Sequence, residues 1–287
     1  MSSEPRPTGL ARRERTGSEK RRIGIRNIAR MLPQSANGRL DGEAPPNIFA
    51  ADLSLMSMED SYCDMWDRSE TIDPRTRSLF NVSLMVAVGN VGNQFELGWH
   101  APGAIHNGVT IEELEAIVVH ARAFVGSPAS AWAMMSIVKA LTEQGLMKAE
   151  FPAPDKARRE KTGSEKRAIG RATLRAMAPD SELIDVPETM PVDGFAAELD
   201  YMMIENVWFD LWSRTDDLDR RSRLVVTLGL LMGLGIEEDL AEFVPIALRS
   251  GLTVPELEEF VYQAATYLGY PAGRRLRRII GAAIPAA

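Results

Sequence analysis

The sequence predicts an all-α fold built from two tandem copies of one helical domain. Three observations support this prediction. No stretch shows the strict alternation of apolar and polar residues that is typical of a half-buried strand. Apolar residues recur instead at helical spacing, between clear helix start and stop signals. A segment near the start of the chain also returns almost unchanged in the second half, which indicates a tandem repeat.

The repeat defines the domain organisation. Residues 11–24 return as residues 157–170, identical at 12 of 14 positions with an offset of 146. The same offset relates four further pairs of residues: Trp66 and Trp212, Arg68 and Arg214, Asp73 and Asp219, Arg77 and Arg223. We therefore expect one copy at 1–150 and another at 151–287, named copy one and copy two, joined by a proline-containing linker near 150–155.

Length, composition and charge exclude several classes of protein. With 287 residues, of which 45% are apolar and 25% charged, the chain can bury one large core or two smaller ones. Its net charge of −7 argues against a dedicated nucleic-acid-binding protein, so we interpret the arginine-rich segment 18–31 as a solvated helix face or tail. The chain contains neither a long apolar run nor an apolar signal segment. Its single cysteine, Cys63, cannot form an internal disulfide. We expect a cytoplasmic protein that binds neither membranes nor nucleic acids.

Helix signals follow one another along copy one. We predict helices over these segments: 18–31, 48–66, 74–88, a short one ending at Asn107 and Gly108, 111–125 and 129–144. Asp73 and Pro74 suit the N-cap and first position of the third helix, which is apolar nearly all round and should be the buried central helix. Thr110 and Glu113 form a capping box before the fifth helix, and the run 126–128, Gly-Ser-Pro, ends it.

The same helix start and stop signals recur in copy two. Asp219 begins the counterpart of the central helix, where residues 224–234 are more apolar still. Thr253 and Glu256 repeat the capping box, and Gly269 before Pro271 repeats the stop. Agreement between the copies at each signal is what a shared fold requires.

The pair Glu96 and His100 is the most informative feature for chemistry. Four residues separate them on a predicted helix, so a carboxylate and an imidazole lie over one another on one face. Imidazole is the side chain most easily tuned near neutral pH, and a carboxylate one turn away orients it or raises its pKa. For an arbitrary pair at this spacing, a surface ion pair would be the preferred interpretation.

Copy one contains five short motifs whose order and spacing can be compared with known families: residues 66–68, 73–79, 96–100, 107–114 and 126–129. In order and approximate spacing they resemble the carboxymuconolactone decarboxylase family, and the resemblance covers about 12–145 and 158–280. It implies the fold of the small all-helical alkylhydroperoxidase-D proteins, with the two copies forming a built-in dimer. It also implies assembly into a homo-oligomer.

The resemblance separates two kinds of chemistry. Peroxidase-like relatives place a Cys-x-x-Cys pair ahead of the histidine, because peroxide reduction needs a thiolate and a resolving thiol. Those positions correspond to Asn93 and Glu96, so thiol peroxidase activity is not expected. The decarboxylase branch implies a Glu and His arrangement, which Glu96 and His100 match. We assign His100 as general acid and base and Glu96 as its partner or as a second acid and base.

Four further residues are candidates for substrate binding: Trp99, Asn93, His120 and Arg77. His120 lines the same pocket as His100 under one interpretation and is a core or interface histidine under another. Arg77 recurs as Arg223, so a role in holding the fold is preferred over anion binding. His106 at a helix end suits the negative end of the helix dipole.

Copy two is predicted to have a degenerate site. All three histidines lie in copy one, and alignment of Gly251 with Gly108 sets Asp239 opposite Glu96 and Phe243 opposite His100. We expect copy two to complete the fold, cover one side of the first site and contribute to assembly.

The predicted function is that of a cofactor-independent decarboxylase, or a related lyase or isomerase, acting on a small carboxylated carbonyl or lactone compound. The alternative is a non-catalytic oligomeric scaffold or ligand-binding protein. The histidine spacing matches no zinc signature, so no metal is expected. Copy one carries three extra residues between Gly89 and Gly108, and Ser78 follows the arginine of the central helix where relatives often have glutamate. Both differences indicate a substrate other than carboxymuconolactone itself.

Overall fold

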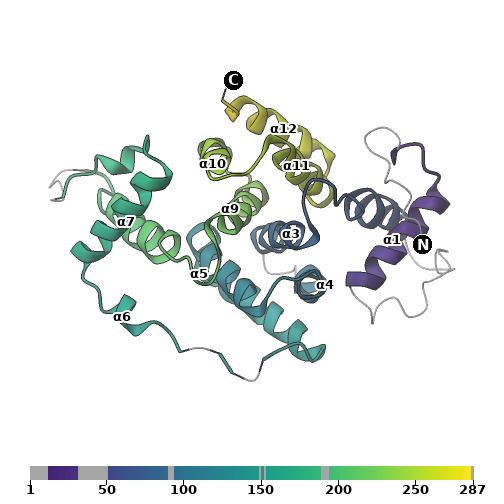
Figure 1. Cartoon of the computed structure of the whole chain (residues 1–287), viewed down its shortest axis with the longest axis horizontal. Helices are drawn as coiled ribbons and strands as arrows, with labels where there is room; N and C mark the ends of the chain where they lie inside the picture. The colour runs from purple at the N-terminus through teal and green to yellow at the C-terminus, as the bar shows by residue number, and fades with distance from the viewer. Residues whose placement is uncertain are drawn as a thin grey trace.

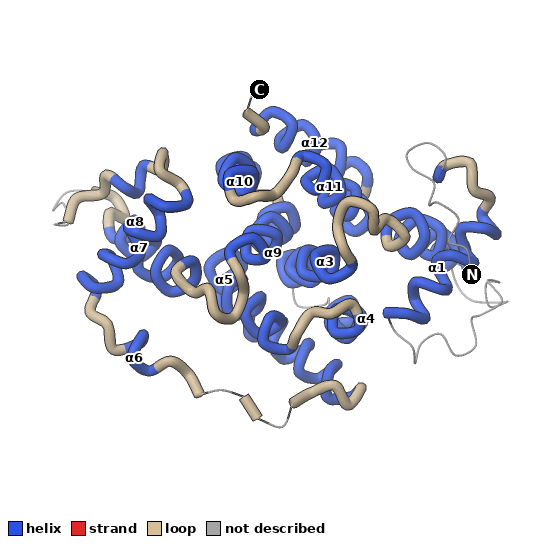
Figure 2. The backbone as a smooth tube through the Cα atoms, in the orientation of Figure 1, coloured by secondary structure: helices blue, strands red, loops and turns tan. Residues whose placement is uncertain are grey.

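The structure is a computed structural model that describes residues 12–31, 51–89, 94–148, 150–151, 153–188 and 194–285. Throughout these ranges every regular element is a helix and none is a strand (Figure 2). The all-α prediction is therefore confirmed. In the same ranges no helix is both long and apolar enough to cross a membrane.

The described part of copy one contains six elements: α1 (Gly17–Met31), α2 (Ala51–Met56), η2 (Ser57–Met65), α3 (Pro74–Val88), α4 (Gln94–His106) and α5 (Ile111–Glu143). The predicted caps are present. The Asp73 carboxylate accepts from the Thr76 backbone N–H at 2.8 Å, and Thr110 and Glu113 form the capping box that begins α5. These side chains satisfy backbone N–H groups that have no partner within the helix.

In copy two the described residues form nine elements: α6 (Lys156–Arg159), α7 (Gly163–Met177), η3 (Glu182–Ile184), α8 (Glu198–Met203), η4 (Ile204–Trp212), α9 (Arg220–Leu234), α10 (Glu237–Arg249), α11 (Val254–Leu268) and α12 (Tyr270–Ala283). Its main helices follow the order of copy one. The element α5 corresponds to α11 and α12 together, because Gly126 interrupts α5 with a φ of 78° just as Gly269 separates α11 from α12 with a φ of 90°. Only glycine adopts such angles without strain.

One predicted helix differs in kind from the structure. We expected a single α-helix over 48–66, of which 48–50 lie outside the described residues. Here α2 is short and continues as the π-helix η2, with η4 in the same place in copy two. An apolar pattern at helical spacing does not distinguish these two geometries, because each π turn adds only about one residue to an α turn.

The two central helices, α3 and α9, lie side by side in the middle of the molecule, while α1 and α7 lie at opposite ends (Figure 1). Both central helices are buried along most of their length, as predicted for α3. Their close approach depends on Gly229 of α9, where a β-carbon would meet the Phe80 carbonyl oxygen and the Ser83 hydroxyl of α3. Apolar side chains from both copies form one continuous buried cluster around this crossing.

One helix of each copy also packs against elements of the other copy. The helix α11 packs against α3 and η2 of copy one, and α5 packs against α9 and η4 of copy two. Any site on η2, α3 and α4 therefore has a wall from copy two, and the equivalent region of copy two has a wall from copy one.

Candidate active site

The His100 site is centred on α4, which places Glu96 and His100 one turn apart on the same side. His100 Nε2 lies 3.5 Å from Glu96 Oε2. The imidazole is 4% exposed, whereas the Glu96 side chain is 41% exposed. The hydrogen bond with His100 lowers the pKa of Glu96 further than its partial burial raises it. An ionised carboxylate at the surface therefore contacts a buried imidazole.

Two aromatic side chains, one from each copy, contact the His100 imidazole. The Trp66 ring of copy one stacks on it with centroids 6.2 Å apart, and the Tyr267 ring of α11 meets it edge-on at 5.4 Å. Trp66 Nε1 donates a hydrogen bond to the Tyr267 hydroxyl at 3.0 Å. The pair fixes the plane in which His100 can present a proton.

Tyr267 is a neutral phenol in this setting. Burial raises its pKa far above the ordinary value of 10.0, and the negative charge that Tyr62 and Glu96 can carry acts in the same direction. The buried Asn81 amide lies near enough to oppose that shift. Even so, neither the oxygen nor the nitrogen of Asn81 makes a hydrogen bond of ordinary geometry within the described part of the chain.

Arg77 connects the two copies beneath this site. Its guanidinium, 1% exposed, donates to Glu259 Oε2 at 3.0 Å and to Gln263 Oε1 at 3.2 Å, both on α11. Arg68 donates to both oxygens of the same Glu259 carboxylate. Arg77 also donates to the Arg68 carbonyl oxygen. These contacts support its interpretation as a residue that holds the fold, and they leave the substrate-binding role without support from its geometry.

His120 does not lie beside His100, so the shared-pocket interpretation is corrected. The physical reason is that α5 packs against α9 and η4 of copy two. His120 Nε2 is 2.8 Å from the Thr227 hydroxyl, and its ring meets Trp212 edge-on at 5.1 Å. Burial, aided by the nearby Arg223 charge, lowers the pKa of His120 well below 6.5. It is thus a buried neutral histidine of the second aromatic cluster.

The second aromatic cluster, named the His120 cluster, consists of Phe124, His120, Trp212 and Phe243. Phe243 occupies the position of His100 and stacks on Trp212 at 5.7 Å. Asp239, opposite Glu96 in the alignment, is exposed. The described members of the cluster include no carboxylate paired with an imidazole, and the degeneracy of copy two stays a prediction.

The remaining candidates are placed as follows. Trp99 is partly buried and packs with Met31 and Trp66 next to the His100 site. Asn93 lies outside the described residues. His106 is exposed in the last turn of α4, where the dipole interpretation stays a prediction. Cys63 is buried, and burial raises the pKa of its thiol, so it lacks the thiolate character of a reactive cysteine.

Three residues of α11 contribute to this region without having been predicted from the sequence: Glu259, Gln263 and Tyr267. A signal was present. Tyr267 follows the capping Thr253 at the same distance as Phe124 follows Thr110, so a tyrosine replaces a phenylalanine at an equivalent position. The sequence offered no indication that this helix crosses to the other copy.

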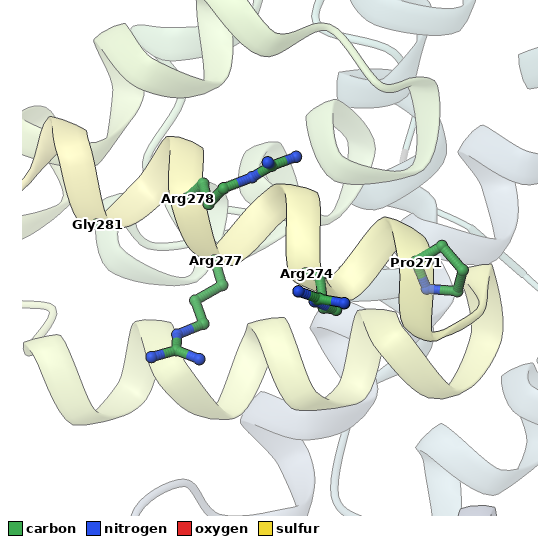
Figure 3. A pocket seen from close by; sticks show the side chains of 5 residues that line it. All are labelled: Pro271, Arg274, Arg277, Arg278 and Gly281. Carbon is green, nitrogen blue, oxygen red and sulfur yellow. The ribbon is translucent and has the colours of Figure 1, made fainter.

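A separate hollow of about 630 Å³ lies on α12, lined by Pro271, Arg274, Arg277, Arg278 and Gly281 (Figure 3). The Arg277 side chain extends away from that of Arg278, so the guanidinium groups do not converge on one point (Figure 3). The lining offers no acid, base or nucleophile. Across the described residues, no group of three or more His, Cys, Asp or Glu side chains is placed to hold a metal ion.

Comparison with known proteins adds a family to this geometry. A family model described as the carboxymuconolactone decarboxylase family matches residues 60–140 and 197–281, more than half of the chain. A 4-carboxymuconolactone decarboxylase from Acinetobacter baylyi is 35% identical over 65 residues, covering 23% of this chain and 48% of the relative. A nitrosuccinic acid decarboxylase from Metarhizium robertsii is 33% identical over 93 residues, covering 32% of this chain and 60% of the relative. The chain thus spans only about half the length of these curated relatives.

Proposed function

The chain belongs to the carboxymuconolactone decarboxylase family, and from this premise we propose that it is a cofactor-independent carboxy-lyase whose reaction takes place at the His100 site. The single observation that carries the proposal is the contact between Glu96 and His100 at 3.5 Å, with the imidazole buried between Trp66 and Tyr267. Buried proton donors beside a carboxylate are typical of general acid and base catalysis.

The proposed substrate is a carboxylic acid whose carboxylate lies next to an electron-accepting group. The names of the two relatives point to this class, because carboxymuconolactone combines a carboxylate with a lactone and nitrosuccinic acid combines one with a nitro group. In either case the accepting group can take up the electron pair left by CO2. The three extra residues before α4 and Ser78 favour a substrate different from carboxymuconolactone.

The proposed reaction breaks one carbon–carbon bond and forms one carbon–hydrogen bond. The bond to the carboxylate breaks, CO2 leaves, and the electron pair moves onto an oxygen of the accepting group. The imidazolium of His100 then gives its proton to the carbon that lost CO2. Glu96 stabilises the imidazolium before transfer, and its exposed side chain connects His100 to water, from which the proton is replaced.

A second candidate is a ligand-binding or scaffold protein that has lost catalysis. It is supported by the His120 cluster, in which aromatic side chains lie at positions equivalent to those of the His100 site. Under this alternative the His100 site would bind a carboxylic acid without changing it.

A turnover screen tests the proposal. Wild type, His100→Gln and Glu96→Gln are incubated with β-keto, lactone and nitro carboxylic acids, and CO2 release and product mass are followed. We expect CO2 release from at least one acid, abolished by His100→Gln and reduced by Glu96→Gln, with the helical circular dichroism of all three proteins unchanged. Binding without CO2 release in wild type would favour the ligand-binding alternative.

A further inference from the structure

We propose that copy two supplies a catalytic residue to the His100 site: the Tyr267 hydroxyl donates a hydrogen bond to the oxygen on which negative charge develops as CO2 leaves. The buried Asn81 amide, next to this hydroxyl, is the second donor to the same oxygen. The inference rests on the proposed carboxy-lyase function and goes beyond it by naming the group that stabilises the anion.

The hydroxyl of Tyr267 is arranged to donate. Its oxygen already accepts the hydrogen bond from Trp66 Nε1 at 3.0 Å, which directs its own proton elsewhere. The ring contacts the His100 imidazole at 5.4 Å, so an anion held by this hydroxyl would lie close to the proton donor. Because burial raises the pKa of the hydroxyl, the phenol keeps its proton while a substrate oxygen becomes charged.

Asn81 supplies a second observation that points to a ligand. Its amide is fully buried on α3 and close enough to the Tyr267 hydroxyl for a weak hydrogen bond that lowers the pKa of Tyr267, while neither of its polar atoms makes a hydrogen bond of ordinary geometry within the described residues. A buried amide left unpaired costs about 1–3 kcal/mol. A substrate oxygen at this point would accept from the amide nitrogen and recover part of that cost.

The His120 cluster shows that the fold does not need this hydroxyl. Phe124 stands there in place of Tyr267, and Trp212 Nε1 is consequently buried with no partner in the described chain. Thr227 stands in place of Asn81, and its hydroxyl is satisfied by His120 and by the Arg223 carbonyl oxygen. The framework thus folds without the pair, so Tyr267 and Asn81 serve the site that holds the imidazole.

The chemistry needs such donors because the electron pair released with CO2 comes to rest on oxygen. Donors fixed in a buried site stabilise that charge without reorganising. Loss of one oxyanion donor typically lowers kcat by about 10²–10³-fold. The interaction strengthens as charge develops, so the effect falls on kcat rather than on KM.

The test compares Tyr267→Phe with Tyr201→Phe, which removes a buried hydroxyl bonded to the Pro187 carbonyl oxygen elsewhere in copy two. With the acid that wild type turns over, Tyr267→Phe should lower kcat about 10²-fold while KM stays within about threefold, and Tyr201→Phe should change neither. A Tyr267→Phe enzyme with wild-type kcat would overturn the inference about Tyr267. The proposed carboxy-lyase function would still stand in that case if His100→Gln had lost turnover.

A binding measurement separates the two proposals if wild type turns over none of the acids. The probe is 3-nitropropanoate, a carboxylate added in one of two forms. In the preformed nitronate the nitro end carries negative charge on oxygen, and in the nitro form the nitro group carries no net charge. Wild type should bind the nitronate at least about tenfold more tightly than Tyr267→Phe, and both should bind the nitro form equally. Equal nitronate affinity, or no nitronate binding to wild type, would overturn the role of Tyr267.

Discussion

The His100 site and the His120 cluster are built on one framework but differ in what they can do. Both contain a tryptophan at the end of a π-helix, a buried arginine on a central helix and a wall from the opposite copy. In the His100 site, an imidazole contacts a surface carboxylate and the ring of a tyrosine. In the His120 cluster, phenylalanines occupy the positions of the imidazole and of the tyrosine.

The difference shows how a duplicated chain can specialise. Because α5 and α11 each cross to the other copy, a substitution in one copy changes the site of the other. His120 of copy one fills space in the His120 cluster, and Gln263, its equivalent, binds Arg77 under the His100 site. The number of histidines in each copy therefore does not tell which residues form each site, since both copies contribute side chains to each site.

The largest expected effect on stability concerns the ions beneath the His100 site. Burial raises the pKa of Glu259, but the hydrogen bond from Arg68 and the charge of Arg77 lower it further, so the group is ionised. Glu259→Gln leaves buried Arg77 without its counter-charge and should lower the free energy of unfolding by about 3–5 kcal/mol. Urea denaturation measures this.

The matched change in the His120 cluster is Asp217→Asn, since Asp217 pairs with Arg223 but is 30% exposed. Water can replace part of its interaction, so the loss should be clearly smaller. Equal losses at the two positions would show that the arginine networks do not distinguish the two halves.

A smaller effect is expected where the halves meet. Gly229→Ala puts a β-carbon 2.7 Å from the Phe80 carbonyl oxygen of α3 and against the Ser83 hydroxyl. Separating α3 from α9 to relieve this contact should cost about 1–3 kcal/mol. The control is Gly281→Ala on α12, where the added carbon meets nothing within 4 Å. That change should be neutral or stabilise by up to about 1 kcal/mol, and thermal denaturation compares the two.

The smallest effect is a pH dependence specific to the His120 cluster. Burial keeps the pKa of His120 well below 6.5 in the folded chain, so the unfolded chain binds a proton more readily. The stability associated with neutral His120 is fully present above pH 6.5 and is lost as the pH falls below that value, by at most about 1.4 kcal/mol per pH unit.

The variant His120→Gln, which introduces the residue found at position 263, should remove this part of the slope. Urea denaturation between pH 5 and pH 8 measures it, with His106→Gln as the control that changes an exposed histidine. An unchanged slope in His120→Gln would mean that the buried imidazole does not control acid sensitivity.

Most of the fold was predictable because its signals are local. Asp73, Thr110 and Gly126 act on backbone groups within a few residues, and each begins or interrupts a helix as expected. The π geometry of η2 was not predictable, because its apolar pattern suits an α-helix equally. The contacts that α5 and α11 make with the other copy were not predictable either, since they depend on packing between distant segments.

The site was predictable only where its residues share one helix. Glu96 and His100 are separated by a single turn, and the structure keeps them in contact. Tyr267 reaches the same imidazole from 167 positions further along the chain, a distance that no local pattern spans. The sequence left two interpretations of His120 open for the same reason, because its helix belongs to one copy and its surroundings to the other.

The most direct test of the account is CO2 release measured side by side for wild type, His100→Gln and His120→Gln on the same panel of carboxylic acids. Both variants exchange a buried imidazole for the same amide, but only one lies in the proposed active site. The account predicts that His100→Gln loses turnover while His120→Gln retains it. Retained turnover in His100→Gln, or its loss in His120→Gln with the fold intact, would contradict the assignment of the His100 site as the place of reaction.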